Sequence, residues 1–209
     1  PVHKNVDLMI GSNANEWLMY VEEQPTENAV DDFIAGLNKI NAQALRTALG
    51  DVDDIRLALD RLNSAQQMYC PSQLMSKKMA ALNPDTWAYH FTRERAGPAG
   101  AELGAYHGAE IPYVFNSHDS WLPMEKRDRE LSEEIMSYWV NFANSGNPNT
   151  PYKSKVDDSV LATLPTWPRA SSGKVLALGN TTTSIASPEP ALCALFIKAM
   201  LDSGAATAQ

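Results

Sequence analysis

Two residues in the 209-residue sequence are of the types that provide the acid and the base of a hydrolytic triad. Glu16 follows the short segment 11–15, and His107 lies in a segment rich in glycine. Ester hydrolysis by an activated serine needs a base that takes the serine proton, and a carboxylate that orients this base and stabilises its cation. Glu16 and His107 are therefore candidates for these two roles.

Both residues also have simpler interpretations. Glu16 lies three residues after Asn13, which is the spacing of a capping box at a helix N-terminus. A single histidine in a glycine-rich loop is usually structural or solvated. His107 and Glu110 form a His-x-x-Glu pattern, but Gly108 lies between them and no third ligand is apparent, so we expect no metal site. The residue types alone leave these alternatives open.

A short strand is expected before each candidate. Residues 6–11 form an apolar run ended by glycine, which fits a buried parallel strand and puts Glu16 in the loop that follows it. Residues 86–92 are rich in aromatic side chains and fit a second strand. Residues 95–108 contain four glycines and a proline, so His107 is expected on an irregular loop just beyond that strand.

Helices are expected between these two strands. Apolar residues recur at helical spacing in residues 27–37 and again in residues 52–62. A longer helix is expected over residues 64–82, interrupted or kinked at Pro71 and ended ahead of Pro84. Each of these helices has one apolar face to bury.

The C-terminal half predicts two more helices and one more strand. Residues 128–144 give the clearest amphipathic helix of the sequence. Residues 174–178 fit a short strand of the kind found at a sheet edge, and residues 191–200 a final helix. Residues 203–209 are expected to be a disordered tail.

Composition excludes several classes of protein. A hydrophobic fraction of 44% and a charged fraction of 20% are those of a globular protein with one substantial core. The net charge of -8, without clustered Lys and Arg, argues against binding to nucleic acid or an anionic membrane surface. No run approaches the ~18 apolar residues of a membrane span, and the first residues lack an initiator Met and a signal-peptide core. We expect a piece of a longer protein.

Cys70 and Cys193 are the only cysteines. Two cysteines are too few for the disulfide framework of small secreted domains. They could form one bridge or remain two buried thiols, and the residue types do not decide between these possibilities.

Several segments resemble the type-B carboxylesterase and cholinesterase family. Residues 11–17, Gly-Ser-Asn-Ala-Asn-Glu-Trp, are similar to the family's G-x-x-x-x-E-G loop, with Trp17 in place of the usual glycine. Residues 104–115, Gly-Ala-Tyr-His-Gly-Ala-Glu-Ile-Pro-Tyr-Val-Phe, are similar to the stretch around the family's catalytic histidine, and this match is long and specific. Residues 137–149 and 164–168 resemble the helix, turn and loop that follow. The resemblance covers nearly the whole chain in the family's order.

The resemblance implies the C-terminal portion of an α/β-hydrolase, with a mostly parallel central sheet flanked by helices. It implies that Glu16 orients His107, and that His107 acts as general base and then as general acid on a small-molecule carboxylic ester. Glu110 is implied to be a buried carboxylate that supports the histidine loop. No cofactor is implied. No G-x-S-x-G occurs in the sequence, so the nucleophile is expected in a missing N-terminal part, upstream of Pro1.

The same resemblance gives the cysteines a role. Cys70 and Cys193 look like the pair that is bridged near the C-terminus of cholinesterase-like enzymes. A disulfide implies an oxidising compartment, hence a secreted or periplasmic protein. Two alternatives to an esterase stay open: a non-catalytic cholinesterase-like binding or adhesion domain, and a truncated product that is inactive alone.

Overall fold

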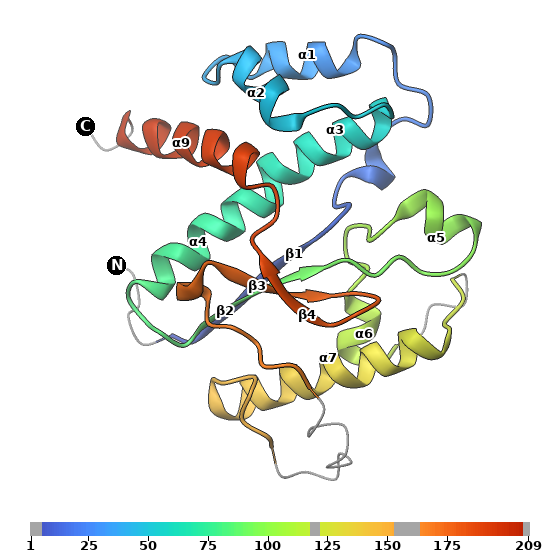
Figure 1. Ribbon diagram of the computed structural model, residues 1–209, viewed down its shortest axis with the longest axis vertical. Coiled ribbons are helices and arrows are strands. Elements are labelled where there is room, and N and C mark those ends of the chain that lie inside the picture. Colours follow the sequence, from blue (N-terminus) through green and yellow to red (C-terminus); the bar gives the residue numbers. More distant parts are fainter. Residues whose placement is uncertain (1–5, 118–121, 153–163, 207–209) are drawn as a thin grey trace.

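The centre of the molecule is a four-stranded sheet, seen in a computed structural model that describes residues 6–117, 122–152 and 164–206 (Figure 1). The first three strands are parallel, and the fourth pairs antiparallel with the third. This mostly parallel sheet confirms the predicted fold class. In spatial order the strands are β1 (Leu8–Asn13), β2 (Thr86–Phe91), β3 (Lys174–Leu178) and β4 (Thr183–Ala186).

Helices surround the sheet and fill the connections between its strands (Figure 1). The described chain contains the α-helices α1 (Ala29–Gly36), α2 (Ala42–Leu49), α3 (Ile55–Ser64), α4 (Cys70–Ala80), α5 (Pro98–Leu103), α6 (Ile111–Phe115), α7 (Lys126–Ser145) and α9 (Pro190–Ala206). Shorter helical segments are the 3-10 turns η1 (Leu18–Tyr20) and η3 (Ala170–Ser172) and the π-helical segment η2 (Ala65–Tyr69). None of the described helices is both long and apolar enough to cross a membrane.

Two neighbouring residues of β2 show how the helices cover the sheet. The Tyr89 ring contacts Trp139 of α7 with a centroid distance of 5.3 Å, whereas His90 contacts Tyr69 of η2, also at 5.3 Å. Because successive side chains of a strand point to opposite faces, α7 lies on one face and the η2–α4 segment on the other. Parallel strands need this cover on both faces.

Buried apolar side chains form two main clusters. One lies between the sheet and the α6–α7 pair and includes Trp87, Phe91, Tyr138 and Trp167. The other joins α1, α2, α3, η2 and α9 around Leu45, Leu62 and Phe196. The second cluster also contains the Cys70–Cys193 disulfide that the family resemblance implied. This bond connects the first residue of α4 to the first turn of α9.

One continuous helical run contains α3, η2 and α4. Of the two expected effects of Pro71, an interruption or a kink, the interruption is wrong, because Pro71 lies in the first turn of α4 and the helix continues through it. The irregularity comes just before the proline, where Ala65–Tyr69 adopts π-helical hydrogen bonding. A proline cannot donate to the carbonyl of the preceding turn, and the wider π turn accommodates it without ending the helix.

The C-terminal part differs from expectation in two places. β3 is an inner strand instead of an edge strand, because it pairs with β2 on one side and with the unpredicted β4 on the other. Helix α9 continues to Ala206, so residues 203–206 are helical where a disordered tail was expected. Ser203 stabilises this last turn by donating to the carbonyl of Ala199 (2.7 Å) and accepting from Lys39 Nζ (3.1 Å). Residues 207–209 lie outside the described residues.

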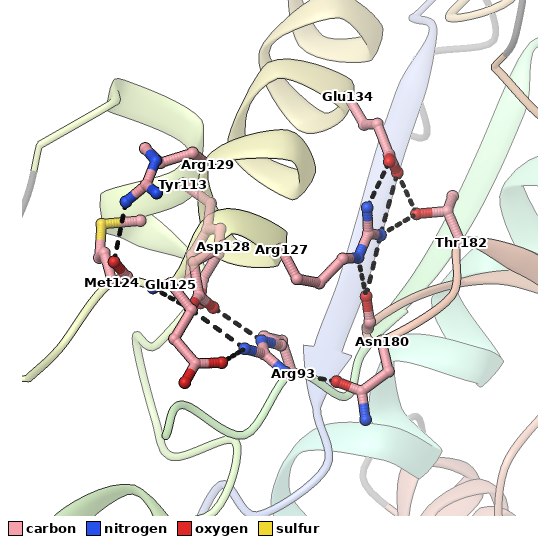
Figure 2. A network of polar contacts seen from close by, with 11 residues as sticks. Arg93, Tyr113, Met124, Glu125, Arg127, Asp128, Arg129, Glu134, Asn180 and Thr182 are labelled. Carbon is pink, nitrogen blue, oxygen red and sulfur yellow. Dashed lines mark hydrogen bonds and ion pairs between the residues drawn. The ribbon is translucent and has the colours of Figure 1, made fainter. Parts of the chain in front are cut away.

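A polar network joins the end of β2 to α7 and to the β3–β4 turn (Figure 2). Arg93 donates twice to the carboxylate of Asp128, from Nε at 2.7 Å and from Nη2 at 3.1 Å. Tyr113 donates its hydroxyl to the same carboxylate (2.7 Å), and Arg93 also donates to Asn180. Asp128 is fully buried, so this bidentate ion pair is shielded from water. It fixes α6 and α7 against the carboxyl end of β2.

Candidate active site

The carboxyl ends of β1 and β2 bring together the two loops that carry Glu16 and His107. The strands are parallel neighbours, with Asn13 opposite Phe91. Beyond the sheet, Asn15 donates its N–H to the carbonyl of Ala105 (3.0 Å) and forms an isolated parallel bridge with Tyr106. Pairing therefore continues past β1. It fixes the loop that carries Glu16, the acid loop, directly beside the loop that carries His107, the histidine loop.

Glu16 and His107 form a direct hydrogen bond. Oε2 of Glu16 lies 2.7 Å from Nδ1 of His107. The glutamate side chain is only 7% exposed, whereas that of the histidine is 47% exposed. Because Nδ1 faces the carboxylate, the other ring nitrogen, Nε2, is left to face a reacting group. This is the relation that the acid and base have in a serine-hydrolase triad.

The second oxygen of Glu16 accepts a hydrogen bond from the backbone N–H of Asn13 at 2.6 Å. This contact is half of the capping box considered above. No helix begins at Asn13, however, and its side chain does not cap one. Nδ2 of Asn13 donates instead to the carbonyl of Tyr106 (2.8 Å) and to Glu110 Oε2 (2.6 Å). Asn13 thereby connects the acid loop to the histidine loop.

Burial determines the electrostatics of Glu16. Desolvation raises the pKa of its carboxyl above the ordinary value, while the hydrogen bonds from Asn13 and His107 act in the opposite direction. The negative charge of Glu110 adds a smaller upward contribution to the pKa. The ionised form of Glu16 therefore depends on its two hydrogen-bond donors.

Glu110 comes directly before α6 and is half-buried, where the family resemblance implied a buried carboxylate. Its described hydrogen bond is to Asn13 Nδ2, so it acts on the acid loop and has no bond to the His107 ring. No group of three or more potential metal ligands occurs among the described residues. The role of Glu110 as a support for the histidine loop remains a prediction.

Trp17, which replaces the family's usual glycine, has an ordinary backbone conformation. Its φ of -109° and ψ of -11° are accessible to any residue, so the loop does not need glycine here. The Trp17 ring packs on Tyr20 at 5.7 Å, and the Tyr20 ring lies 6.4 Å from that of His107. Two aromatic rings therefore extend from the acid loop towards the histidine.

Asp60 of α3 is a buried residue of this region that the sequence patterns do not predict. Its carboxylate accepts hydrogen bonds from Asn15 and Trp17, the two neighbours of Glu16. In the sequence, Asp60 looks like a solvated residue of an amphipathic helix. The pattern that could have revealed it is the i, i+4 pair of short polar residues, Asp60 and Ser64, among the buried apolar residues of α3.

The profile of the carboxylesterase family matches residues 2–195. The chain belongs to the carboxylesterase family. It is 35% identical over 101 residues to an acetylcholinesterase of Bungarus fasciatus, a match that covers 46% of this chain and 16% of that protein. It is 29% identical over 182 residues to an acetylcholinesterase of Danio rerio, which covers 75% of this chain and 27% of the relative. The chain thus spans less than a third of these curated relatives.

Solved esterase structures share the fold. The crystal structure of Aspergillus niger EstA superposes with a TM-score of 0.72 at 20% identity, over 94% of this chain and 40% of that one. A structure named PNB esterase gives a TM-score of 0.62 at 20% identity, over 88% and 36% of the two chains. The sheet and helices of this carboxylesterase-family chain therefore correspond to part of an esterase α/β-hydrolase fold.

Proposed function

We propose that this chain is the C-terminal portion of a serine carboxylic-ester hydrolase and contributes the acid, Glu16, and the base, His107, of a Ser-Glu-His triad. The observation that carries the proposal is the 2.7 Å hydrogen bond between Glu16 Oε2 and His107 Nδ1. The carboxylesterase membership of the chain supports the same assignment. The retained acid–base pair favours an esterase over a non-catalytic binding domain.

In the proposed mechanism, Nε2 of His107 takes the proton of a serine hydroxyl as the serine oxygen attacks the ester carbonyl. The tetrahedral intermediate collapses to an acyl-enzyme, and His107 gives its proton to the departing alcohol. Water then attacks the acyl carbon while His107 takes its proton, and the serine–acyl bond breaks as His107 returns this proton to the serine oxygen and the carboxylic acid leaves. Glu16 keeps the Nδ1–H tautomer and stabilises the imidazolium, but it does not take the proton.

The serine must come from another part of the protein. No G-x-S-x-G occurs in these 209 residues. The partial coverage of the curated relatives is consistent with a parent enzyme that is longer than this chain. The Cys70–Cys193 disulfide supports a secreted or periplasmic location for that enzyme, because such bonds persist in oxidising compartments.

The test compares this chain with a longer protein that adds the serine-bearing part. With a short-chain aryl ester, we expect no His107-dependent turnover from the chain alone. In the longer protein, we expect His107→Ala and Glu16→Gln to lower kcat by roughly 10³-fold or more, the scale seen for triad members. Glu22→Gln is the matched control, because Glu22 is exposed and lies in the same segment.

Two outcomes would contradict this proposal. Equal activities of Glu16→Gln and Glu22→Gln would show that Glu16 is not the triad acid. Turnover by the isolated chain that disappears in His107→Ala would show that the nucleophile lies within these 209 residues.

A further inference from the structure

Asp60 is a carboxylate buried in the middle of α3, with no exposed surface. Its Oδ2 accepts from Asn15 Nδ2 at 2.9 Å. Its Oδ1 accepts from the backbone N–H of Trp17 at 2.9 Å and from the hydroxyl of Ser64 at 2.8 Å. All three of these donors are electrically neutral.

Asn15 and Trp17 are the residues immediately before and after Glu16. Asp60 therefore binds the acid loop on both sides of Glu16, one oxygen to each side. The same Asn15 amide accepts the backbone N–H of Ala105 through Oδ1 at 3.1 Å. A continuous chain of hydrogen bonds thus runs from Asp60 through Asn15 to the loop that carries His107.

A carboxylate in this position is energetically costly. Desolvation raises the pKa of Asp60, and the hydrogen bonds from Asn15, Ser64 and the backbone of Trp17 and Leu18 only partly oppose this effect. A buried charge that is bound by neutral donors stabilises a fold less than a well-packed apolar side chain would. The carboxylate instead fixes the conformation of the acid loop, because each of its oxygens binds one neighbour of Glu16.

We propose that Asp60 is a positioning residue for the Glu16–His107 pair, and that it acts by holding Asn15 and Trp17 so that Glu16 Oε2 meets His107 Nδ1. The inference rests on the proposed function. Asp60 acts through the loop and takes no part in proton transfer. It sets the direction of the Glu16 carboxylate, and hence the tautomer of His107.

The tautomer is the property to measure. In the full chain, the nitrogen-15 chemical shifts of the neutral His107 ring report the populations of the Nδ1–H and Nε2–H forms. We expect the wild-type ring to be mainly Nδ1–H, because this proton faces Glu16. Asp60→Asn keeps the size of the side chain but replaces one acceptor oxygen by an N–H₂ group. We expect it to lower the Nδ1–H to Nε2–H ratio roughly tenfold, the effect of losing about one hydrogen bond.

Two further variants make the test decisive. Asp53→Asn removes the same charge from an exposed position just before α3, and it should leave the ratio unchanged. Asn15→Ala breaks the same chain of hydrogen bonds from its half-buried side, so it decides the question if Asp60→Asn does not fold. A wild-type ratio in both Asp60→Asn and Asn15→Ala would overturn the inference.

The assay also separates this inference from the proposed function. A wild-type ring without an Nδ1–H preference would overturn the triad geometry itself, and the positioning role with it. In the longer, serine-containing protein, we expect Asp60→Asn to lower kcat roughly hundredfold at nearly constant KM, the effect of a misplacement of about 1 Å. A fixed tautomer and an unchanged kcat in Asp60→Asn would leave the triad standing and refute the role of Asp60.

Discussion

The side chain of Asn15 occupies the space that a Cβ atom on Gly104 would need. A Cβ built on Gly104 would lie 2.3 Å from Oδ1 of Asn15, well inside van der Waals contact. Gly104 also has a φ of +62°, in the region that side chains other than glycine rarely adopt. The acid loop and the histidine loop therefore meet at a glycine for two independent reasons, backbone conformation and space.

Gly104→Ala tests this contact, and Gly50→Ala is its matched control. Both glycines end a helix with positive φ and extended ψ, but nothing lies within 4 Å of a Cβ on Gly50. We expect Gly50→Ala to lower the free energy of unfolding by about 1–3 kcal/mol through backbone strain. Gly104→Ala should cost at least about 1–3 kcal/mol more, because the methyl group must displace Asn15. If urea unfolding shows the same loss of free energy in the two variants, the predicted clash between a methyl group at Gly104 and Asn15 is contradicted.

The disulfide between Cys70 and Cys193 should be a major source of stability. It closes a loop across a sequence separation of 123 residues. In the chain-entropy model such a loop contributes roughly 4–5 kcal/mol, because the cross-link restricts the unfolded chain. We expect a loss of this size in the Cys70→Ala/Cys193→Ala double variant, measured by urea unfolding against the unreduced protein. Two free thiols in the unfolded, unreduced chain would refute the bond.

Asp128 of α7 should tolerate substitution poorly. Burial acts to raise the pKa of its carboxyl, but hydrogen bonds from Arg93, Tyr113 and the Glu125 backbone outweigh it and hold the pKa below its ordinary value. Asp128→Asn removes the buried ionic partner of Arg93, which is itself only 8% exposed, and leaves this guanidinium only the more distant carboxylate of Glu125 at 3.8 Å. We expect a loss of about 3–5 kcal/mol in the free energy of unfolding.

The control for Asp128 is on the same helix. Glu130 pairs with Lys126 at the surface, where the side chains are 45% and 88% exposed. Glu130→Gln should change the free energy of unfolding by less than about 1 kcal/mol. Because the folded-state pKa of Asp128 is lowered, its contribution is present above its ordinary pKa and is lost as pH falls. The difference between Asp128→Asn and wild type should therefore shrink in acid.

His90 should make the protein sensitive to mild acid. Burial lowers the pKa of its imidazole to about 4, although the Ser12 backbone and the charge of Glu189 act in the opposite direction. An unfolded histidine titrates near pH 6.5, so the unfolded chain binds the extra proton first. The stability due to neutral His90 is complete above pH 6.5 and decreases as pH falls towards 4.

We expect this decrease to reach about 3 kcal/mol in the free energy of unfolding between pH 7 and pH 4. The comparison with His90→Gln isolates it from the carboxylates that titrate in the same range. His90→Gln cannot gain this proton. The difference in the free energy of unfolding between the variant and the wild type should therefore change by that amount. Parallel pH profiles of the two proteins would exclude His90 as the cause.

Continuous apolar runs and hydrophobic periodicity predicted the elements that bury apolar side chains. The strand expected over residues 6–11 corresponds to β1, and the helix over 128–144 corresponds to α7 with small shifts at both ends. β4 gave no such signal, because three of its four residues are exposed and Ile185 is only half-buried. Its strand conformation depends on the hairpin with β3, a tertiary contact that the local sequence does not encode.

The candidate site likewise has one part that the local sequence predicts and another that only tertiary contacts create. The family resemblance of the surrounding segments predicts Glu16 and His107, whose residue types alone also allow a helix cap and a solvated histidine. The parallel pairing of β1 with β2 brings the two residues into contact, and no local pattern contains that pairing. Asp60 was missed because a helical period does not distinguish a buried carboxylate from a solvated one at the border of the apolar face.

The π-helical segment Ala65–Tyr69 has a consequence for which changes of length the protein can tolerate. A π turn contains one residue more than an α turn, and each residue of an α-helix turns the chain by about 100°. Deleting one residue here would convert the wide turn into an α turn, which also completes about one full turn, so Asp60 and Cys70 would keep their relative direction. We expect a single deletion in this segment to be tolerated better than a single deletion within α3 or α4, where each lost residue rotates the following part of the helix by about 100°.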